Sequence, residues 1–265
     1  MNCSLIITTY NWESALELVI LSTLHQSYPP IEVIIADDGS NNNTRELIQE
    51  LTVKSPFPII HSWHEDKGFR AAKARNRAIA KAKGDYIIVI DGDMILHKDF
   101  VLDHFHYAKP GYFVQGVRVK LNSQKANEIL KNKQYTFKSF ENGIKNKRKS
   151  LRSPLLYYLF SGRRVFKTLD MLQTCNMAFF KNDCISVNGF NEDFIGWGRE
   201  DSEFAAKLFH SGKKRRDLRF KGLAYHIHHE GNSRSMLEIN HQIYLNTINN
   251  RLCWSTNGID KYLKK

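Results

Sequence analysis

Short apolar runs rich in β-branched residues alternate with longer segments of helical spacing over the first 120 residues. No other feature constrains the fold as strongly, because strands that alternate with helices form βαβ units on a parallel sheet. The pattern predicts strands at 3–9, 31–36, 57–62, 85–91 and 112–119, and helices at 13–26, 42–52, 70–82 and 98–107. We therefore predict an α/β fold with a mixed, mainly parallel central sheet.

The pattern becomes less regular after residue 120. Residues 122–168 form a polar, basic stretch, which we interpret either as a mobile insertion or as helical cover with a solvated face. Regular patterning returns as a strand at 172–180, a helix at 199–210, a strand at 222–226 and a helix at 236–253. Because no repeat or low-complexity linker separates these parts, we expect one domain over residues 1–265. Its expected parts are an N-terminal half at 1–120, a basic insertion at 121–170 and a C-terminal half at 171–265.

The composition limits the classes of protein and partner. The chain has 39 Lys and Arg against 27 Asp and Glu, a net charge of +12, so we expect anionic partners. Hydrophobic residues make up 42% of the chain, enough for a substantial core, yet no apolar run approaches the ~20 residues of a membrane span. The N-terminus has no basic region typical of a signal peptide. The cysteines Cys3, Cys175, Cys184 and Cys253 form no CxxC pair, which favours a reduced, cytoplasmic setting.

Polar and acidic side chains gather where three of the predicted strands end. Residues 8–11 follow the first strand, Asp37 and Asp38 the second, and residues 91–93 the fourth. Ligands of open α/β sheets bind beyond the carboxyl ends of the strands, because loops and helix N-termini converge there. These loops are therefore the first candidates for a binding site.

The fourth strand is followed by Asp91-Gly92-Asp93. Two carboxylates at the end of a buried strand repel each other and lose hydration unless they share a cation. A divalent ion, Mn²⁺ or Mg²⁺, that bridges a diphosphate would supply this charge, and Gly92 would let the backbone approach the ligand. An acidic turn that caps the following helix is the alternative. Asp37 and Asp38 likewise fit either a plain turn or acceptors for a base or ribose.

Further segments combine residue types that suit binding or catalysis. Residues 67–77 place cations at a helix start, where they oppose the macrodipole and call for a phosphate, unless they form a solvated face. Trp197 lies between two glycines, which predicts a loop whose ring packs on a sugar or on protein. Glu200 and Asp201 are either favourable first-turn acids or include a general base. The histidines at 226–229 offer imidazole to a metal or phosphate, or are structural.

In this order, the motifs resemble those of the inverting glycosyltransferases of family 2, which have the GT-A fold, a Rossmann-like architecture of nucleotide-diphospho-sugar transferases. The resemblance covers about residues 3–230, and residues 1–120 match the nucleotide-sugar-binding half. The segment 189–201 is similar to the acceptor-side motif of β-1,4-galactosyltransferases and bacterial chondroitin-type polymerases. One departure is Arg199, where the galactosyltransferase pattern has glycine. A long cation beside the base is expected to change the acceptor contacts.

The resemblance implies a role for each matching residue. Asp201 would be the catalytic base, and Glu200, Trp197, Gly198 and Arg199 would bind the acceptor sugar. The implied nucleotide-sugar-binding residues are Thr8, Thr9, Tyr10, Asn11, Asp37, Asp38, Lys67, Arg70, Arg75, Asp91, Gly92 and Asn176. The implied ligands of Mn²⁺ or Mg²⁺ are Asp93, Asp91, His226 and, as a less favoured substitute, His229.

The resemblance also implies a reaction. It is the metal-dependent, inverting transfer of a hexose or N-acetylhexosamine, with galactose or N-acetylgalactosamine favoured, from a UDP-sugar donor. The acceptor would be a hydroxyl of a surface glycan, as in lipopolysaccharide, lipooligosaccharide or capsule. The alternatives are a nucleotidyltransferase, which also uses paired carboxylates and a metal, and a non-enzymatic basic module that binds glycan or nucleic acid. Nucleic acid is not the expected partner, because the acids at the strand ends would repel phosphate.

Three basic clusters lie away from the expected catalytic loops, at 145–152, 213–219 and 261–265. We interpret them as a surface for anionic headgroups or acidic glycan. A peripheral position on the inner face of the cytoplasmic membrane would follow from the first of these partners. A merely solvated basic face is the alternative.

Overall fold

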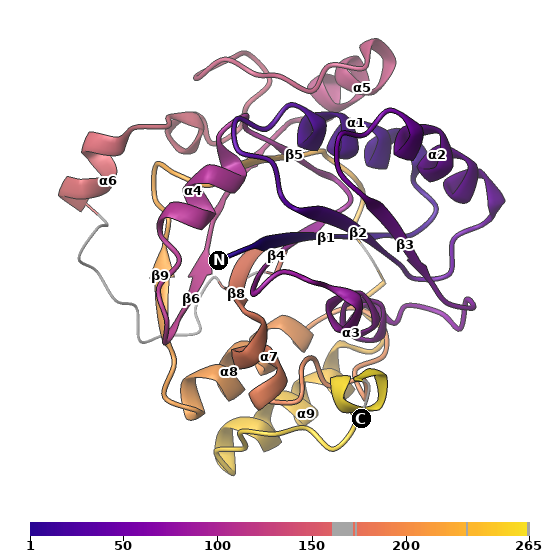
Figure 1. Ribbon diagram of the computed structural model, residues 1–265, viewed down its shortest axis with the longest axis vertical. Helices are drawn as coiled ribbons and strands as arrows, with labels where there is room; N and C mark the ends of the chain where they lie inside the picture. The colour runs from indigo at the N-terminus through magenta and orange to yellow at the C-terminus, as the bar shows by residue number, and fades with distance from the viewer. Residues whose placement is uncertain (161–171, 173, 232, 264–265) are drawn as a thin grey trace.

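A seven-stranded sheet crosses the middle of the computed structural model, which describes residues 1–160, 172, 174–231 and 233–263 (Figure 1). In spatial order its strands are β3 (Ile59–Trp63), β2 (Glu32–Asp37), β1 (Cys3–Thr9), β4 (Tyr86–Asp91), β8 (Asn176–Phe180), β6 (Tyr112–Gln115) and β9 (Lys214–Asp217). A smaller sheet has the order β5 (Met94–Leu96), β10 (Leu223–His226) and β7 (Val117–Lys120).

The first four strands of the large sheet are parallel. β1 pairs with β2 on one side and with β4 on the other, and β2 pairs with β3. The helices α1 (Glu13–Leu24), α2 (Asn42–Val53) and α3 (Ala71–Lys81) alternate with these strands along the chain. The predicted βαβ units are therefore confirmed, and the predicted strand bounds agree with the observed ones to within two residues.

The later part of the chain completes the large sheet with strands of both directions. β8 lies between β4 and β6 and is antiparallel to both, whereas β9 is parallel to β6. The sheet is mixed and mainly parallel, as predicted. In the small sheet, β10 is antiparallel to β5 and parallel to β7.

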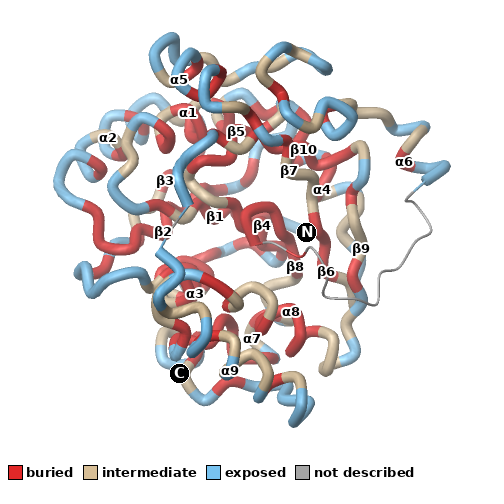
Figure 2. Tube along the Cα trace, turned by 180° about the vertical axis from the view of Figure 1, so that it is seen from behind, coloured by how far each residue is buried: buried red, intermediate tan, exposed pale blue. Residues whose placement is uncertain are grey.

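Each face of the large sheet has its own hydrophobic core. Alternate residues of a strand point to opposite faces, so Ile88 and Ile90 of β4 belong to one core and Ile87 and Val89 to the other. The first core is covered by α1 and α2, and the second by α3 and α8 (Glu200–His210) (Figure 1). Seen from behind, the strands in the middle of the molecule are buried and the outer turns are exposed (Figure 2). A sheet covered on both faces explains why these strands are continuous apolar runs.

The predicted strand at 112–119 is wrong in one respect, because the chain leaves one sheet and enters the other within it. β6 belongs to the large sheet and β7 to the small one, and Gly116 lies between them. A Cβ at Gly116 would lie only 2.0 Å from the side-chain oxygen of Asn176, so the crossing requires glycine. A continuous apolar pattern cannot reveal such a change of sheet.

The basic stretch after residue 120 contains helical cover rather than only irregular chain. Its described helices are α5 (Ser123–Asn132), the 3₁₀ helix η1 (Lys147–Ser150) and α6 (Pro154–Phe160). Part of the stretch, at 161–168, lies outside the described residues. The other described helices are α4 (Phe100–His106), α7 (Lys181–Ser186), α9 (Leu237–Asn249) and the 3₁₀ helix η2 (Ile259–Tyr262). Among the described residues, no helix combines the length and the apolar character needed to cross a membrane.

Candidate active site

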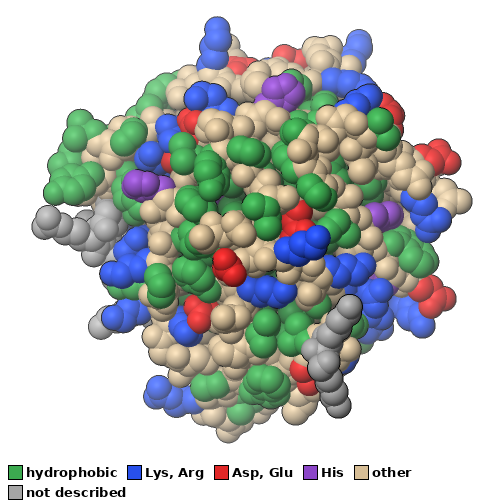
Figure 3. Space-filling model, viewed as in Figure 1, with side chains coloured by type: hydrophobic (Ala, Val, Ile, Leu, Met, Phe, Trp, Pro, Cys, Tyr) green, Lys and Arg blue, Asp and Glu red, His purple; other side chains and the backbone are tan. Residues whose placement is uncertain are grey.

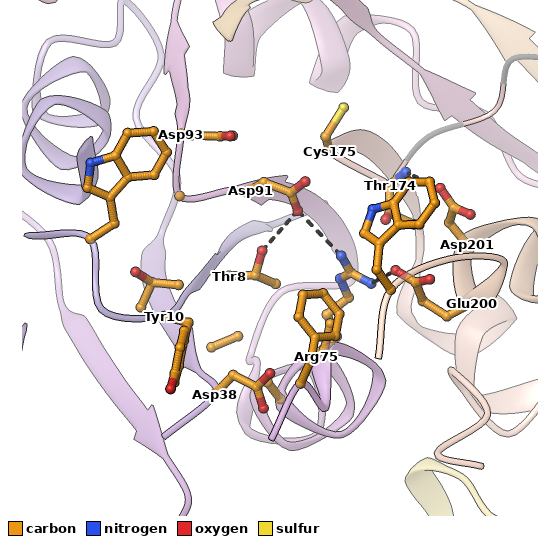
Figure 4. Close-up of a pocket in the computed structure, with 18 of the residues that line it drawn as sticks. Thr8, Tyr10, Asp38, Arg75, Asp91, Asp93, Thr174, Cys175, Glu200 and Asp201 are labelled. Atoms are coloured by element: carbon orange, nitrogen blue, oxygen red, sulfur yellow. Dashed lines mark hydrogen bonds and ion pairs between the residues drawn. The ribbon is translucent and has the colours of Figure 1, made fainter. Parts of the chain in front are cut away.

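A cleft of about 420 Å³ opens beyond the carboxyl ends of β1, β2 and β4, where α8 begins. The predicted residues that line it are Thr8, Thr9, Tyr10, Asp38, Arg75, Asp91, Gly92, Asp93, Trp197, Glu200, Asp201 and His229. We call it the acidic cleft, because five carboxylates line it. Figure 4 shows Asp91 near its centre, with Asp93 to one side and Glu200 and Asp201 to the other.

Arg75 of α3 joins the two halves of the acidic cleft. It is 4% exposed, and its guanidinium lies 3.4 Å from Asp91 Oδ1 and 3.2 Å from Glu200 Oε1 (Figure 4). Thr8 Oγ1 donates a hydrogen bond of 2.9 Å to the same oxygen of Asp91. Burial raises the pKa of Asp91 and the nearby Asp93 charge adds to this, while Arg75 and Thr8 favour the carboxylate. Arg75 therefore fixes Asp91 and Glu200 in place as well as contributing charge to the cleft.

Asp93 and two histidines form the one group with metal-ligand geometry that we find among the described residues. The ligand atoms of Asp93, His226 and His229 all lie within 4.8 Å of one another. Asp93 Oδ2 is 3.2 Å from His226 Nε2 and 3.1 Å from His229 Nε2. Asp93 Oδ1 is buried and has no hydrogen-bond partner among the described residues. A carboxylate oxygen with an unfilled lone pair beside two imidazoles fits a divalent cation.

The electrostatics of this group favour an ionised acid. Burial opposes the ionisation of Asp93, but hydrogen bonds from His226 and His229 outweigh it and lower its pKa to about 2. The hydrogen bond to Asp93 raises the pKa of His229. Trp12 packs edge-on against the His229 ring, with centroids 5.7 Å apart, and holds its orientation. His226 and His229 are thus equally near to Asp93, and the geometry offers both rings as ligands.

Gly92 has a packing reason as well as its place in the cleft. A Cβ at Gly92 would lie 2.6 Å from the backbone oxygen of Thr8, which has no room to move because β1 and β4 are paired there. The turn between Asp91 and Asp93 therefore has to be made by glycine at this position. Gly92 also lines the cleft, where the predicted approach to a ligand stays a prediction.

Asp201 lies in the first turn of α8 and points into the acidic cleft (Figure 4). The backbone N–H of Ser202 donates to its Oδ1 at 2.7 Å, and the N–H of Thr174 donates to its Oδ2 at 3.4 Å. Burial raises its pKa to about 7, with the neighbouring Glu200 charge as the next cause. A carboxylate that is half protonated near neutral pH suits proton transfer.

The loops after β1 and β2 divide into residues that face the cleft and residues that hold the loops. Asp38 lines the cleft and its Oδ2 accepts a hydrogen bond of 2.7 Å from the N–H of Arg70. Asp37 is fully buried and accepts from the N–H groups of Gly39 and Ser40 and from His61, so it is a turn residue. Of the two interpretations, turn residue or ligand-binding residue, the structure places Asp37 in the turn beneath the site and Asp38 at the site.

Several predicted ligand-binding residues do not line the cleft. Asn11 joins the two loops by accepting a hydrogen bond from the N–H of Asn41. Lys67 is exposed and paired with Glu65 at 3.0 Å, which agrees with a solvated face. The Arg70 side chain donates back to the Lys67 carbonyl oxygen. Each of these three side chains has a polar partner within the protein.

Asn176 is placed in the core rather than at the nucleotide-sugar site. It is fully buried, and its amide donates to the carbonyl oxygens of Val117 and Gly222. Its Oδ1 lies 2.9 Å from His104 Nε2, and because burial lowers the pKa of His104 to about 4, that ring is neutral and donates the bond. Asn176 therefore joins the large sheet to the small one.

The glycine-flanked tryptophan loop is only partly as expected. Trp197 lines the cleft and is 38% exposed, with the Arg234 guanidinium 5.6 Å from its ring centroid. Gly198 does not line the cleft, and a Cβ there would lie 2.8 Å from Leu237 at the start of α9. Arg199 does not line the cleft, and its guanidinium lies over the Tyr244 ring of α9, 5.3 Å from the ring centroid. Its φ of 73° is a conformation that favours glycine, the residue of the galactosyltransferase pattern.

Comparisons with known proteins decide the family. The sequence profile of "Glycosyl transferase family 2" matches residues 4–183, more than half of the chain. The chain belongs to glycosyl transferase family 2. A second profile, "N-terminal domain of galactosyltransferase", matches residues 167–230. The predicted family and the galactosyltransferase-like motif are both confirmed.

Relatives of this family 2 protein include enzymes that build polysaccharides. It is 29% identical to a chondroitin synthase of Pasteurella multocida over 84% of this chain and 24% of the relative. It is 26% identical to a chondroitin synthase of Escherichia coli over 84% of this chain and 34% of the relative. The chain thus spans about a quarter to a third of the length of these curated relatives.

Solved structures agree with the GT-A fold. The crystal structure of S. aureus TarS superposes with a TM-score of 0.64 at 18% identity, covering 94% of this chain and 40% of that one. The mannosyltransferase PcManGT from Pyrobaculum calidifontis, in complex with GDP-Man and Mn²⁺, superposes with a TM-score of 0.59 at 18% identity, covering 92% and 61%. At this identity, the likeness establishes the fold alone.

The cleft of this family 2 protein has lining residues that the sequence did not single out, namely Trp12, Ala36, Phe69, Ala71, Ala74, Arg118, Thr174 and Cys175. Trp12 directly follows the loop at 8–11 and Phe69 lies within the segment at 67–77, so the position of each in the sequence could have found it. Arg118 lies within an expected strand, and nothing in its neighbourhood marks it. Burial raises the pKa of the Cys175 thiol, so it is not a nucleophile at neutral pH.

Proposed function

We propose that this protein is a metal-dependent, inverting glycosyltransferase that uses a UDP-sugar donor and Asp201 as its base. The observation that carries the proposal is the position of Asp201. Its pKa is raised to about 7, and it lines the same cleft as the paired acids Asp91 and Asp93. A base and a diphosphate site in one cleft are what direct displacement at an anomeric carbon requires.

The proposed step is a single displacement. Asp201 takes the proton of the acceptor hydroxyl as its oxygen forms a bond to the anomeric carbon of the donor sugar. The bond from that carbon to the diphosphate oxygen breaks, its electron pair leaves with UDP, and the configuration at the carbon inverts. Hydrogen bonds from Ser202 and Thr174 orient the carboxylate of Asp201 for this transfer. Glu200, held by Arg75, would bind the acceptor sugar beside it.

The donor would lie along the ends of β1 and β2. Asp38 and the loop of Thr8, Thr9 and Tyr10 line that side of the cleft, and we assign the uridine to them. Solved structures of S. aureus TarS in complex with UDP and with UDP-GlcNAc support a uridine nucleotide. The galactosyltransferase profile supports galactose or N-acetylgalactosamine as the sugar.

Asp93, His226 and His229 would hold a divalent cation, with Asp91 nearby in the cleft. When bound, the ion would neutralise charge that develops on the departing diphosphate. Two imidazole ligands favour Mn²⁺ over Mg²⁺, because Mg²⁺ prefers oxygen ligands and keeps its waters. The Mn²⁺ in the complex of the Pyrobaculum mannosyltransferase agrees with this choice.

The acceptor that we propose is a bacterial surface glycan, such as lipopolysaccharide, lipooligosaccharide or capsule. The two chondroitin synthases support a polysaccharide product, as does a putative teichuronic acid biosynthesis glycosyltransferase of Bacillus subtilis that is 35% identical over 36% of this chain. In these relatives the named products are polymers with acidic groups.

We also propose that the protein works in the cytoplasm, on an anionic membrane surface. Two apolar side chains of α6, Leu155 and Leu159, are more than half exposed. In the space-filling view, hydrophobic side chains gather at the edge where α6 lies in Figure 1 (Figure 3). The exposed cations Lys145 and Lys147 precede this helix in the sequence. Apolar side chains beside cations are typical of surfaces that bind anionic lipid headgroups.

A donor screen tests the proposal. The protein is incubated with Mn²⁺ and a panel of UDP-sugars and other nucleotide sugars, and the nucleotide product is identified. We expect slow hydrolysis of a UDP-sugar that releases UDP, and faster release once an acceptor is added. Hydrolysis of other nucleotide sugars alone would overturn the uridine assignment. Release of pyrophosphate would indicate a nucleotidyltransferase instead.

A further inference from the structure

A second cavity of about 660 Å³ lies next to the acidic cleft, and Arg118 lines both. Its lining residues are Gln115, Gly116, Val117, Arg118, Lys120, Arg148, Lys149, Phe160, Arg215, Asp217, Leu218, Arg219 and Phe220. Six of these are cations and one is an anion, so we call it the cationic cavity. Its volume is within the range of ligand sites in proteins.

Most of this charge is not neutralised within the protein. Asp217 is the acid of the cavity, and its carboxylate is already paired with Arg215 at 2.7 Å. Arg118, Lys120, Arg148 and Lys149 form no ion pair with any described residue. Cations gathered around a hollow repel one another and concentrate anions from solution. The cavity therefore has the electrostatic character of an anion-binding site.

Two basic segments that are far apart in the sequence form its walls. One wall is the stretch at 145–149, which is held along β7 by three hydrogen bonds. The Lys145 N–H donates to Lys120 O at 2.8 Å, the Lys120 N–H to Asn146 Oδ1 at 2.8 Å, and the Asn146 amide to Arg118 O at 3.1 Å. These bonds place Arg148 and Lys149 beside the strand that carries Arg118.

The other wall is the turn after β9, and one buried acid holds both walls together. Asp103 of α4 accepts hydrogen bonds from the Arg152 guanidinium at 2.8 and 2.9 Å, from Lys221 at 3.1 Å and from the Gly222 N–H at 2.9 Å. Asp103 pairs with Arg152 and Lys221, and Asp99 also pairs with Arg152; both of these cations lie outside the lining of the cavity. Asp103 thus anchors the two walls through residues beside the cavity and forms no ion pair with Arg118, Lys120, Arg148 or Lys149 in the part of the chain that the structure describes.

The cavity also offers an aromatic surface. Phe160 is half exposed, and its ring centroid is 6.3 Å from that of Phe220. Phe220 has a φ of 64°, a conformation that is rare for a bulky side chain and is often found at functional sites. Aromatic faces pack against sugar rings, whereas a free inorganic ion needs no such surface. Cations and aromatic rings in one cavity indicate a sugar with anionic groups.

We propose that the cationic cavity binds a stretch of acceptor glycan bearing carboxylate or phosphate groups, so that the end of the glycan passes Arg118 and reaches Asp201. This inference rests on the proposed function, because it assigns the acceptor of that reaction. Arginine recognises carboxylates and phosphates by paired hydrogen bonds, and Arg118 is placed to contact the acceptor where the two hollows meet.

Direct binding to the full chain tests the proposal. Three fluorescent oligomers of six units are compared by anisotropy: a glucuronic-acid-containing oligosaccharide, a glycerol phosphate oligomer and a neutral N-acetylglucosamine oligomer. We expect at least one anionic oligomer to bind about tenfold more tightly than the neutral one, and to bind less well as salt is raised. The preferred anionic oligomer distinguishes carboxylate from phosphate. Equal binding of all three would overturn the proposal.

A charge-reversal pair locates the binding. The double variant Arg148→Glu/Lys149→Glu is expected to lose about tenfold in affinity for the anionic oligomer. The matched control is Lys131→Glu/Lys138→Glu, which changes the charge equally at exposed residues outside both hollows and is expected to bind within about twofold of wild type. Thermal unfolding shows whether each variant is folded. Equal loss in both variants would mean that net charge, not the cavity, attracts the oligomer.

Two further outcomes separate this inference from its alternatives. If UDP-sugar is hydrolysed but no anionic oligomer binds, the inference fails and the proposed function stands. If an anionic oligomer binds but no nucleotide sugar is hydrolysed, the proposed function fails while the cavity keeps its ligand. If Arg148→Glu/Lys149→Glu binds the oligomers as wild type does but no longer binds phosphatidylglycerol vesicles, the cations face a membrane and the inference is overturned.

Discussion

The acidic cleft and the cationic cavity are neighbours with opposite charge. In the cleft, the carboxylates of Asp91 and Glu200 are paired with the buried Arg75, and Asp93 is paired with two histidines. In the cavity, Arg118, Lys120, Arg148 and Lys149 have no carboxylate partner among the described residues. The first site is largely organised by its own side chains, whereas the second needs an anion from outside the protein.

This difference agrees with the uses that we propose, reaction in the acidic cleft and acceptor binding in the cationic cavity. A site of reaction gains from groups that are already fixed, because little reorganisation is then needed in the transition state. A site that binds a long, variable chain benefits from an electrostatic field that attracts the chain, and it needs few fixed contacts. The predictions below test the two sites separately, beginning with the largest expected effect.

Asp201→Asn tests whether the acidic cleft contains the base. The amide cannot accept the proton, so we expect sugar transfer to fall by about 10²- to 10⁴-fold, with little change in the KM for the donor. UDP release in the presence of acceptor measures this. Asp193→Asn is the control, because Asp193 is an exposed acid eight residues earlier that does not line the cleft. If Asp201→Asn had the turnover of wild type, the base would have to be another residue.

Asp93→Ala tests whether the cleft holds a cation. Asp93 would be a direct ligand of the ion, beside the two histidines. Removal of a residue that only orients a metal ligand typically weakens metal binding by about 10- to 100-fold, so we expect Asp93→Ala to weaken Mn²⁺ binding by at least this much. Electron paramagnetic resonance of free Mn²⁺ measures the affinity without an activity assay. His228→Ala is the matched control, since His228 is exposed and is not one of the three grouped residues. Equal Mn²⁺ affinities of wild type and Asp93→Ala would show that the cation does not bind at Asp93.

Mn²⁺ affinity should also depend on pH. Protons compete with the ion for the histidines, and the hydrogen bond to Asp93 raises the pKa of His229, so the ring binds its proton more tightly than usual. We expect affinity to fall as pH is lowered through the range in which histidine titrates. A constant affinity between pH 5 and 8 would contradict this.

The pH dependence of kcat/KM tests the environment of Asp201. The base must be ionised, so activity is expected to be lost as pH falls below about 7, the pKa to which burial raises this carboxyl. The Glu200 charge is the next cause of the shift, so Glu200→Gln should move the acidic limb to lower pH. The control is again Asp193→Asn, which should leave the limb in place. A limb near pH 4 in wild type would show that the pKa of the catalytic acid is not raised, because 3.8 is the ordinary value for aspartate.

The same pKa shift predicts a change in stability. Folded Asp201 binds its proton more tightly than unfolded Asp201, so its contribution to the free energy of unfolding decreases as pH rises from 3.8 to about 7. Asp201→Asn cannot ionise and should lose this component of the pH dependence. Urea unfolding of both proteins at pH 5 and pH 8 measures the difference. If the free energy of unfolding changed equally between pH 5 and pH 8 in wild type and in Asp201→Asn, the raised pKa would be contradicted.

The smallest expected effect concerns α6, beside the cationic cavity. Leu159 is 61% exposed, and Leu159→Ser should weaken binding to anionic vesicles by about two- to fivefold, because only part of one side chain is withdrawn from the lipid. Vesicle sedimentation at low salt measures this. Ile239→Ser on α9 is the matched control, since Ile239 is 55% exposed on another helix. Equal losses in both variants, or no vesicle binding by wild type, would reject the membrane surface.

Much of the fold could be predicted because apolar periodicity is a local signal. The strands β1 to β4 follow from β-branched runs such as residues 86–90, which are buried on both faces of the sheet. The signal failed where the chain changes partners. Residues 112–120 form one apolar pattern but two strands in two sheets, and the short strands β5 and β9 have too few residues to show a period.

The site was predictable where residues follow a strand directly, as Asp91, Asp93 and Asp38 do. It was not predictable where two neighbours in sequence face different ways. Asp37 and Asp38 carry the same group and are both buried, but Asp37 ends β2 and accepts hydrogen bonds from the following turn, whereas Asp38 follows the strand and lines the cleft. Arg118 shows the opposite case, because its role arises from the meeting of two hollows built from distant segments.

The position of β8 has a consequence for how the protein folds. This strand begins at residue 176, yet it fills the centre of the large sheet between β4 and β6. During synthesis, the edges of β4 and β6 that pair with β8 therefore stay without hydrogen-bond partners until most of the polypeptide has left the ribosome. Long-range pairing of this kind slows folding, and open edges invite association with other chains. Fragments that stop before residue 180 are expected to aggregate even though they contain every βαβ unit.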